Sequence, residues 1–352
     1  MEEKTNDMLG MLDLMVCPGF CVKEKEIVKV NPAARGLLLE PGTDVRALLL
    51  TGREEYAAFE SGCLYLSLSV SGQPYGASVV RMENFDVFLL EQEEDREELR
   101  ALALAAKELR SPLSNVMTAA GQLLASGADP QTREQLGSLN RGLYQLLRIV
   151  GNMSDAGSHI PQWETRNLSA ILDEVFEKSR TLLDRAGIPL SYQPLNEAVY
   201  GLADRDLLER AVLNILSNAL KFTPRGGQIQ ASLTRRGRTL RLSVQDSGSG
   251  IAENILSSIH RRYLRQPTLE DSRYGIGLGM VLIRSAAASH GGTVLIDQPE
   301  GSGTRVTMTL AIRQNPDNVL RSPRFPVDYT GGYDHALVEL SGSLPPELFD
   351  SN

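Results

Sequence analysis

Three short clusters of polar residues and glycines in the second half of the chain have the residue types and the order to bind a nucleotide. They are Asn214-Ile-Leu-Ser-Asn218-Ala-Leu-Lys221, Asp246-Ser-Gly248-Ser-Gly250-Ile251 and Gly275-Ile-Gly277-Leu278-Gly279. Each cluster alone is a weak signal, because short glycine motifs occur by chance in many proteins. Taken together, their order and spacing describe one site.

The first cluster lies on an amphipathic helix predicted over residues 205–221. Polar residues at steps of four, four and three form one stripe along this helix: Arg210, Asn214, Asn218 and Lys221. Asparagine oxygens that face a cavity can ligate Mg2+, with water and phosphate oxygens completing the octahedron. The lysine one turn further along can neutralise phosphate charge. A solvated helix face is the alternative interpretation of the stripe.

The second cluster follows a predicted strand over residues 240–244. Asp246, at the end of that strand, can accept a hydrogen bond from the exocyclic amine of adenine. Gly248 and Gly250 let the backbone approach the base closely, since they carry no side chain.

The third cluster opens a helix predicted from about Leu278 to His290. Free N–H groups at a helix start, together with the positive end of the helix dipole, favour phosphate binding. The cluster is not a Walker loop, because no Gly-Lys-Ser/Thr follows it.

These clusters resemble the N, G1 and G2 boxes of the ATP-binding domain shared by sensor histidine kinases, DNA gyrase, Hsp90 and MutL. Asparagine at both 214 and 218, followed by Ala-Leu-Lys-Phe-Thr-Pro224, is similar to the histidine kinase branch. The resemblance covers roughly residues 165–313 and implies ATP and Mg2+ as cofactors. It implies that Asn218 holds Mg2+, that Asp246 reads adenine and that Asn214 is catalytic. The remaining cofactor-binding residues that it implies are Lys221, Gly248, Gly250, Gly275, Gly277, Leu278 and Gly279.

Two runs of apolar residues at alternating steps of three and four precede these clusters, as in coiled-coil seams. They are Leu102, Ala106, Leu109, Leu113, Val116, Ala120 and Leu123, and then Leu136, Leu139, Leu143, Leu146, Val150 and Met153. Between them, Asp129 is a predicted cap and Pro130 a first helical residue. A hairpin with one apolar stripe per helix buries too little alone, so a homodimeric four-helix bundle is expected. The pattern also resembles the dimerisation and phosphoacceptor domain of the same kinases.

The segment Lys107-Glu108-Leu109-Arg110-Ser111-Pro112-Leu113 matches the family's H-box except at its first residue, where the kinases have histidine. Neutral imidazole is nucleophilic near neutral pH, and the adjacent acid, here Glu108, can take its proton as the catalytic base. Lysine is almost entirely a protonated ammonium at that pH and cannot attack phosphorus. Self-phosphorylation at Lys107 is therefore not expected. Ser111 stands where the family often has a residue that orients water, which leaves a response-regulator phosphatase open.

The N-terminal part is predicted to contain a hairpin over residues 19–31, a helix that begins near Asn31, and strands near 63–70, 76–82 and 85–91. It looks like a shortened PAS sensor, especially at Ile27-Val-Lys-Val-Asn-Pro-Ala-Ala34. A small α+β dimerisation module with an empty core is the alternative.

Composition limits the class of protein. A chain of 352 residues predicts two or three domains, and a net charge of −8 argues against general nucleic-acid binding. No apolar run approaches the roughly 18 residues of a membrane span, and no secretory signal pattern is present, so a cytoplasmic protein is expected. Residues 315–352 carry six acidic residues and two arginines, and they are predicted to dock on the kinase domain or on a partner.

The predicted fold class is α+β multidomain, with a Bergerat-type α/β sandwich as the ATP-binding domain. The domains are a PAS-like sensor (1–92), a two-helix dimerisation domain (93–157), a linker (158–166), the ATP-binding domain (167–313) and an acidic tail (314–352). The expected function is two-component signalling by an ATP-dependent histidine kinase relative that acts on a response regulator or a histidine-containing partner kinase. The alternatives are a catalytically silent, nucleotide-gated scaffold and the phosphatase.

Overall fold

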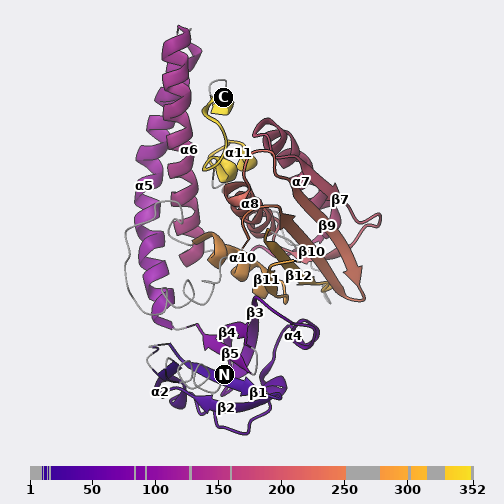
Figure 1. Ribbon diagram of the computed structural model, residues 1–352. Helices are drawn as coiled ribbons and strands as arrows, with labels where there is room; N and C mark the ends of the chain where they lie inside the picture. Colours follow the sequence, from indigo (N-terminus) through magenta and orange to yellow (C-terminus); the bar gives the residue numbers. More distant parts are fainter. Residues whose placement is uncertain are drawn as a thin grey trace.

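The protein consists of an N-terminal sheet, a long helical hairpin and a second α/β part that lies beside the hairpin (Figure 1). The computed structural model describes residues 10, 12–13, 15, 17–82, 85–91, 93–126, 129–158, 161–250, 278–299, 303–314 and 330–349. Within these ranges, no helix combines the length and the hydropathy of a membrane span.

The N-terminal part contains the strands where the sequence predicts them. Its strands are β1 (Gly19–Lys23), β2 (Glu26–Val30), β3 (Cys63–Val70), β4 (Gln73–Arg81) and β5 (Asp86–Leu90). Its short helices are α2 (Pro32–Arg35), α3 (Val45–Leu48) and α4 (Arg53–Ala57). Asn31 is fully buried and caps α2 by accepting a hydrogen bond from the Ala34 N–H at 2.8 Å. The core of this part includes the stacked rings of Phe20 and Phe88, 4.8 Å apart.

The hairpin consists of α5 (Glu93–Ala125) and α6 (Pro130–Ser158). The predicted cap is confirmed, because Asp129 Oδ1 accepts hydrogen bonds from the N–H groups of Gln131 and Thr132. The predicted seam of α5 divides into two stripes. Ala106, Leu113 and Ala120 are buried. Leu109, Val116 and Leu123, seven residues apart, are 50–56% exposed.

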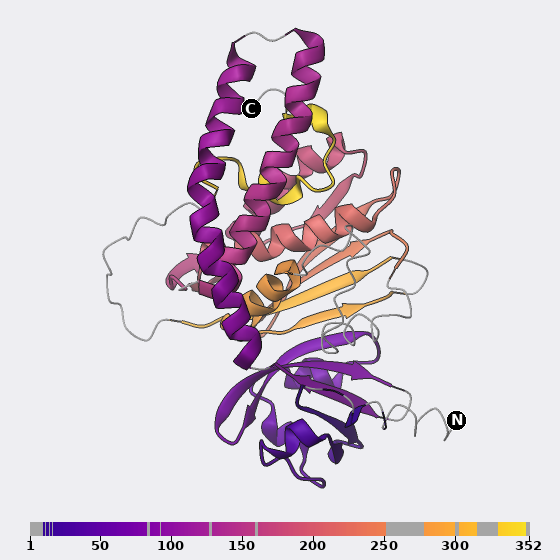
Figure 2. The same ribbon diagram turned by 90° about the vertical axis from the view of Figure 1, so that its left-hand side faces the viewer.

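The second α/β part begins with β6 (Glu164–Asn167), which pairs with β8 (Tyr200–Ala203). Its other strands are β7 (Leu190–Gln193), β9 (Ile229–Arg236), β10 (Thr239–Asp246), β11 (Val294–Asp297) and β12 (Arg305–Ala311). Its helices are α7 (Leu168–Arg185), α8 (Arg205–Phe222) and α10 (Leu278–Ser289). These helices cover one face of the sheet and lie between it and the hairpin (Figures 1 and 2). Leu240, Leu242 and Val244 of β10 are buried, as the predicted alternation requires.

The two sheets are continuous, which the division into separate sensor and ATP-binding domains does not anticipate. Ten strands follow the order β2-β1-β5-β4-β3-β11-β12-β10-β9-β7, and β3 pairs antiparallel with β11. Gly62, with φ +92°, sits at this junction, and a Cβ there would lie 2.1 Å from the carbonyl oxygen of Ile296. Arg284 of α10 forms an ion pair with Glu91 and lies 4.5 Å from the centre of the Tyr65 ring.

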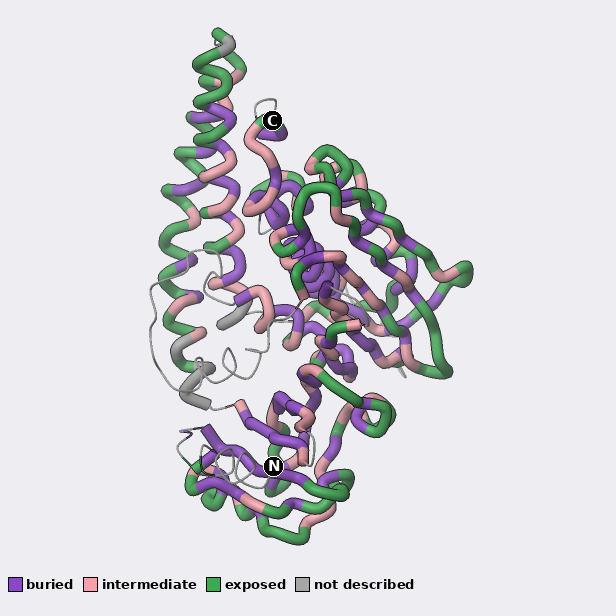
Figure 3. The backbone as a smooth tube through the Cα atoms, viewed as in Figure 1, coloured by how far each residue is buried: buried purple, intermediate pink, exposed green. Residues whose placement is uncertain are grey.

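Residues 330–349, the described part of the acidic tail, dock on their own chain. Helix α11 (His335–Leu340) packs against α6 and α8, and the 3-10 helix η1 (Pro346–Phe349) packs against α6. Half of residues 330–349 are buried there (Figure 3), and Val338, Leu340 and Phe349 are fully inaccessible to solvent. The sequence left two docking partners open, the kinase domain or another protein. In the structure residues 330–349 dock on the chain itself.

Candidate nucleotide site

Helix α8 carries the first cluster, and its sequence explains its position. Asp204 caps the helix by accepting a hydrogen bond from the Leu207 N–H at 2.9 Å. Leu208, Val212 and Leu216 are fully buried and hold the helix on the sheet and its neighbours. The polar stripe therefore faces away from the sheet, toward the hairpin and the tail.

The four residues of the polar stripe differ in exposure. Arg210 and Asn214 are 2% and 4% exposed, whereas Asn218 and Lys221 are partly exposed. The Asn214 side-chain amide donates to the carbonyl oxygen of Arg210 at 2.9 Å and to Oε2 of Glu339 at 3.4 Å. Asn218 and Lys221 are thus the members of the stripe with solvent-accessible side chains.

Asp246 lies at the end of β10 with its carboxylate fixed by the backbone. Its Oδ1 accepts hydrogen bonds from the N–H groups of Gly248 at 2.8 Å and Thr304 at 3.2 Å. Both of these bonds go to Oδ1. Burial raises the pKa of Asp246, and the two N–H groups oppose that rise. Sequence reasoning missed Thr304 as part of this site, although it directly follows Gly303.

The second and third clusters both contact α8. A Cβ on Gly248 would lie 2.4 Å from the carbonyl oxygen of Phe222, the last residue of α8. A Cβ on Gly279 would lie 2.6 Å from Oδ1 of Asn214. The first approach, to backbone, requires glycine, and the second leaves no room for a side chain unless Asn214 moves. The described residues of the three clusters are therefore at one place.

Other predicted residues lie around this place or outside the described ranges. Leu278 is buried at the first position of α10, and Gly250 adopts φ +76° after the second cluster. Gly275 and Gly277 lie outside the described residues, as does the stretch between Gly250 and Leu278 in which the sequence predicts the lid.

The predicted H-box lies on the other side of the hairpin. Lys107 and Glu108 are exposed on α5, and α6 lies between α5 and α8 (Figure 1). Glu108 therefore has solvent around it, and the structure does not bring it together with Asn214.

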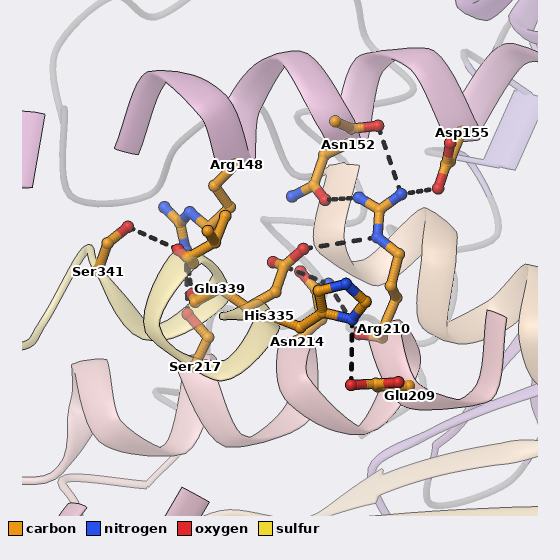
Figure 4. A network of polar contacts seen from close by, with 12 residues as sticks. Arg148, Asn152, Asp155, Glu209, Arg210, Asn214, Ser217, His335, Glu339 and Ser341 are labelled. Carbon is orange, nitrogen blue, oxygen red and sulfur yellow. Dashed lines mark hydrogen bonds and ion pairs between the residues drawn. The ribbon is translucent and has the colours of Figure 1, made fainter. Parts of the chain in front are cut away.

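A buried polar network that no sequence pattern predicts joins α8, α6 and the tail (Figure 4). Arg210 donates to Oδ1 of Asn152 at 2.6 Å and forms ion pairs with Asp155 of α6 and Glu339 of α11. Arg148 of α6 donates to the hydroxyl of Ser217 at 3.0 Å. A buried guanidinium needs such partners, because an unpaired buried charge is strongly destabilising.

The donor set near α8 suits Mg2+ only in combination with a ligand. Among the described residues, no group of three or more histidine, cysteine, aspartate or glutamate side chains could hold a metal ion. Asn218 can supply one amide oxygen, and phosphate and water oxygens would have to supply the others. Such a site fits a metal that arrives with a nucleotide.

His290 directly follows α10 and links this helix to the N-cap residue of α8. It is 2% exposed, and its Nδ1 lies 2.7 Å from the Ala286 carbonyl oxygen, which assigns the ring proton to Nδ1. Its Nε2 accepts the Asp204 N–H at 3.2 Å. Burial lowers the pKa of His290, so the neutral ring is favoured here.

A cavity of about 650 Å³ lies in the N-terminal part, apart from the nucleotide clusters. Arg81 and Asp86 on its wall pair with each other, and the Tyr56 hydroxyl donates to Asp86 at 2.6 Å. Arg46 likewise pairs with Asp44. Because these charges satisfy one another, the lining does not identify a ligand.

Residues 203–314 match the family model described as "Histidine kinase-, DNA gyrase B-, and HSP90-like ATPase", named HATPase_c. This region is similar to that family and is called the HATPase_c domain below, and over a longer stretch the chain is similar to sensor histidine kinases. It is 27% identical over 224 residues to the sensor-like histidine kinase SenX3 of Mycolicibacterium smegmatis, covering 61% of this chain and 57% of that protein. It is 31% identical over 237 residues to the histidine protein kinase DivJ of Caulobacter vibrioides, covering 62% of this chain and 38% of DivJ.

The chain spans about half the length of the SenX3 proteins that it matches. Among solved structures, histidine kinase ThkA in complex with response regulator protein TrrA is similar, with a TM-score of 0.44 and 16% identity. That likeness covers 84% of this chain and 96% of the other.

The match includes α8, β10, α10, β12 and the segments next to them that hold Gly248, Gly250 and Thr304. The region that matches the HATPase_c model is thus the part of the chain in which the three clusters meet.

Proposed function

We propose that the protein is an ATP-dependent signalling protein of the two-component type that binds Mg-ATP at α8, Asp246 and α10. The observation that supports this most is the Asp246 carboxylate, which two backbone N–H groups hold in place. Next to it, Gly248 lets the second cluster pack closely against the end of α8. In this proposal Asp246 reads adenine, Asn218 holds Mg2+ and Lys221 faces the phosphates. Gly248, Gly250, Leu278 and Gly279 line the nucleotide, with Gly275 and Gly277 continuing the third cluster.

The proposed reaction is phosphoryl transfer to a histidine of a partner protein. Lys107 is exposed on α5 where the kinases have their acceptor, and an ammonium has no lone pair for attack. Asn214, one turn before Asn218, is the residue of this chain proposed to support the transfer, and Glu108 would serve as base only beside an acceptor. The proposed partners are a histidine-containing kinase, which would receive the phosphoryl group, and a response regulator.

We further propose that the protein acts as a homodimer. Leu109, Val116 and Leu123 on α5 form an exposed apolar stripe with a seven-residue repeat. Leu139 and Leu146 on α6 repeat at the same interval and are 49% and 50% exposed. A second hairpin that covers both stripes would complete a four-helix bundle. The N-terminal part is proposed to be the PAS-like sensor, and a cytoplasmic location stays a prediction.

Nucleotide binding is tested by thermal or chemical unfolding with and without Mg-ATP. At about a hundred times its dissociation constant, a ligand stabilises a protein by about 2.7 kcal/mol. We expect Asp246→Asn and Asn218→Ala to lose most of that stabilisation. Asp297→Asn is the matched control, because Asp297 also ends a strand of the sheet and is 7% exposed, against 6% for Asp246. If the wild type shows no stabilisation by Mg-ATP, the proposed function is wrong.

Phosphoryl transfer is tested by restoring the missing imidazole. We expect Lys107→His to gain acid-labile self-phosphorylation from labelled ATP, with Lys107→Gln as the control that removes the charge without adding a nucleophile. Label on a histidine of a partner kinase incubated with the wild type would support transfer to a partner. Nucleotide binding without any transfer, by the wild type or the variant, would favour the silent scaffold.

A further inference from the structure

The tail residues 330–349 are held at both of their ends by the helical hairpin. Tyr144 of α6 lies edge-on to Tyr333 at 5.3 Å and to Phe349 at 5.2 Å, measured between ring centres. Asn140 donates to the carbonyl oxygen of Phe349 at 3.2 Å, and Gln145 donates to that of Ser341 at 3.2 Å. These contacts involve α6 alone and are independent of the nucleotide site.

The middle of the tail is held by the HATPase_c domain. Glu339 of α11 is completely buried, and its carboxylate lies 3.5 Å from Nε of Arg210 and 3.4 Å from Nδ2 of Asn214 (Figure 4). At the start of the same helix, Nδ1 of His335 lies 3.1 Å from a carboxylate oxygen of Glu209. The tail therefore joins α8 to α6.

Glu339 places a negative charge at the phosphate side of the site. Asn214 contacts Gly279 on one side and Glu339 on the other. Asn218 is one helical turn further along α8. Arg210 is shared between two carboxylates, Glu339 and Asp155, so these three groups carry one positive and two negative charges. In a water-poor site the excess negative charge repels the oxygens of a triphosphate more strongly than it would in bulk water. The contact also engages the amide donor of Asn214, which a phosphate could otherwise use.

We propose that residues 330–349 are an autoinhibitory strap: while docked, they hold the HATPase_c domain on α6 and oppose binding of Mg-ATP. This inference rests on the proposed function, because it names the regulation of the same site. Since two ligands of one site affect each other reciprocally, Mg-ATP must weaken docking of the strap by the factor by which the strap weakens Mg-ATP binding.

The test measures the dissociation constant of Mg-ATP by calorimetry on the full chain and two variants of the strap. Glu339→Gln removes the charge beside Asn214 at constant size. Phe349→Ala removes a fully buried anchor that contacts Tyr144 of α6, at the other end of the strap. We expect both variants to bind Mg-ATP about tenfold more tightly than the wild type. Glu347→Gln is the matched control, since Glu347 is exposed in the same segment, and its affinity should equal that of the wild type.

Hydrogen exchange of residues 330–349 gives a second readout. We expect Mg-ATP to speed exchange in the wild-type strap, and Phe349→Ala to speed it without nucleotide. Equal affinities in the wild type and both variants, with strap exchange unchanged by Mg-ATP, would overturn the strap and leave the proposed function standing. If neither the wild type nor any variant binds Mg-ATP, the proposed function is wrong. The inference that the strap opposes nucleotide binding is then wrong as well.

Discussion

Gly62 provides a direct test of the continuous sheet. A Cβ at this position would lie 2.1 Å from the carbonyl oxygen of Ile296, whereas ordinary contacts begin at 3.4 Å. Because the neighbour is backbone, the two strands must separate by roughly 1 Å, which a ladder hydrogen bond does not survive. We expect Gly62→Ala to open the β3–β11 pairing while each half of the sheet stays folded.

The loss of stability expected in Gly62→Ala has two contributions, which a control variant separates. An alanine forced into positive φ costs about 1–2 kcal/mol, and overpacking against a rigid neighbour adds about 1–3 kcal/mol. Gly72 has φ +78° and nothing within 4 Å of an added Cβ, so Gly72→Ala carries only the first cost. Hydrogen exchange of residues 63–65 and 294–296, which pair across the junction, should therefore rise about tenfold in Gly62→Ala and stay unchanged in Gly72→Ala. Equal exchange in the two variants would refute the close contact between Gly62 and the Ile296 carbonyl oxygen.

Two further predictions concern a buried histidine and the exposed stripe of α5. Burial lowers the pKa of His290 in the folded protein, so its contribution to stability is full above the ordinary histidine pKa and is lost as pH falls below it. Between about pH 7.5 and pH 5.5, urea unfolding should show a larger loss of stability in the wild type than in His290→Gln, and equal losses would contradict this. Val116→Glu should convert the dimer to a monomer in light scattering, because it places a charge in the middle of the exposed seam. Ser114→Glu, about 200° away around the helix, should stay dimeric, and an unchanged dimer in both variants would remove the proposed interface.

The parts of the fold that depend on local sequence signals were predictable. Helix α8 and strand β10 have clear apolar periodicity, and the Asp129 cap has its own side-chain chemistry. The convergence of Asp246, Asn214 and Gly279 followed from the spacing of the three clusters. The periodicity and cap signals lie within single elements, whereas the three clusters are recognisable by their order along residues 214–279.

The parts that were missed depend on contacts between distant segments. The pairing of Leu64 with Leu295 joins two edge strands whose sequences contain no register signal. The seam of α5 was correctly placed on the helix, but periodicity cannot decide which half faces α6 and which half is left exposed. Glu339 is one acidic residue among six in the tail, and only the fold shows that it is buried against Arg210.

These long-range contacts hold the HATPase_c domain from two directions. On one side β11 is paired with β3, and on the other Arg210 is buried between Asp155 of α6 and Glu339 of the strap. Any swing of the domain relative to the hairpin must separate Arg210 from Asp155, which leaves a buried charge without its partner unless water enters. Release of the strap removes one of the two carboxylates and exposes the other to solvent, so it lowers the cost of that separation. Strap release and domain movement should therefore occur together, and a variant that frees the strap should also speed hydrogen exchange at the contact between α6 and α8.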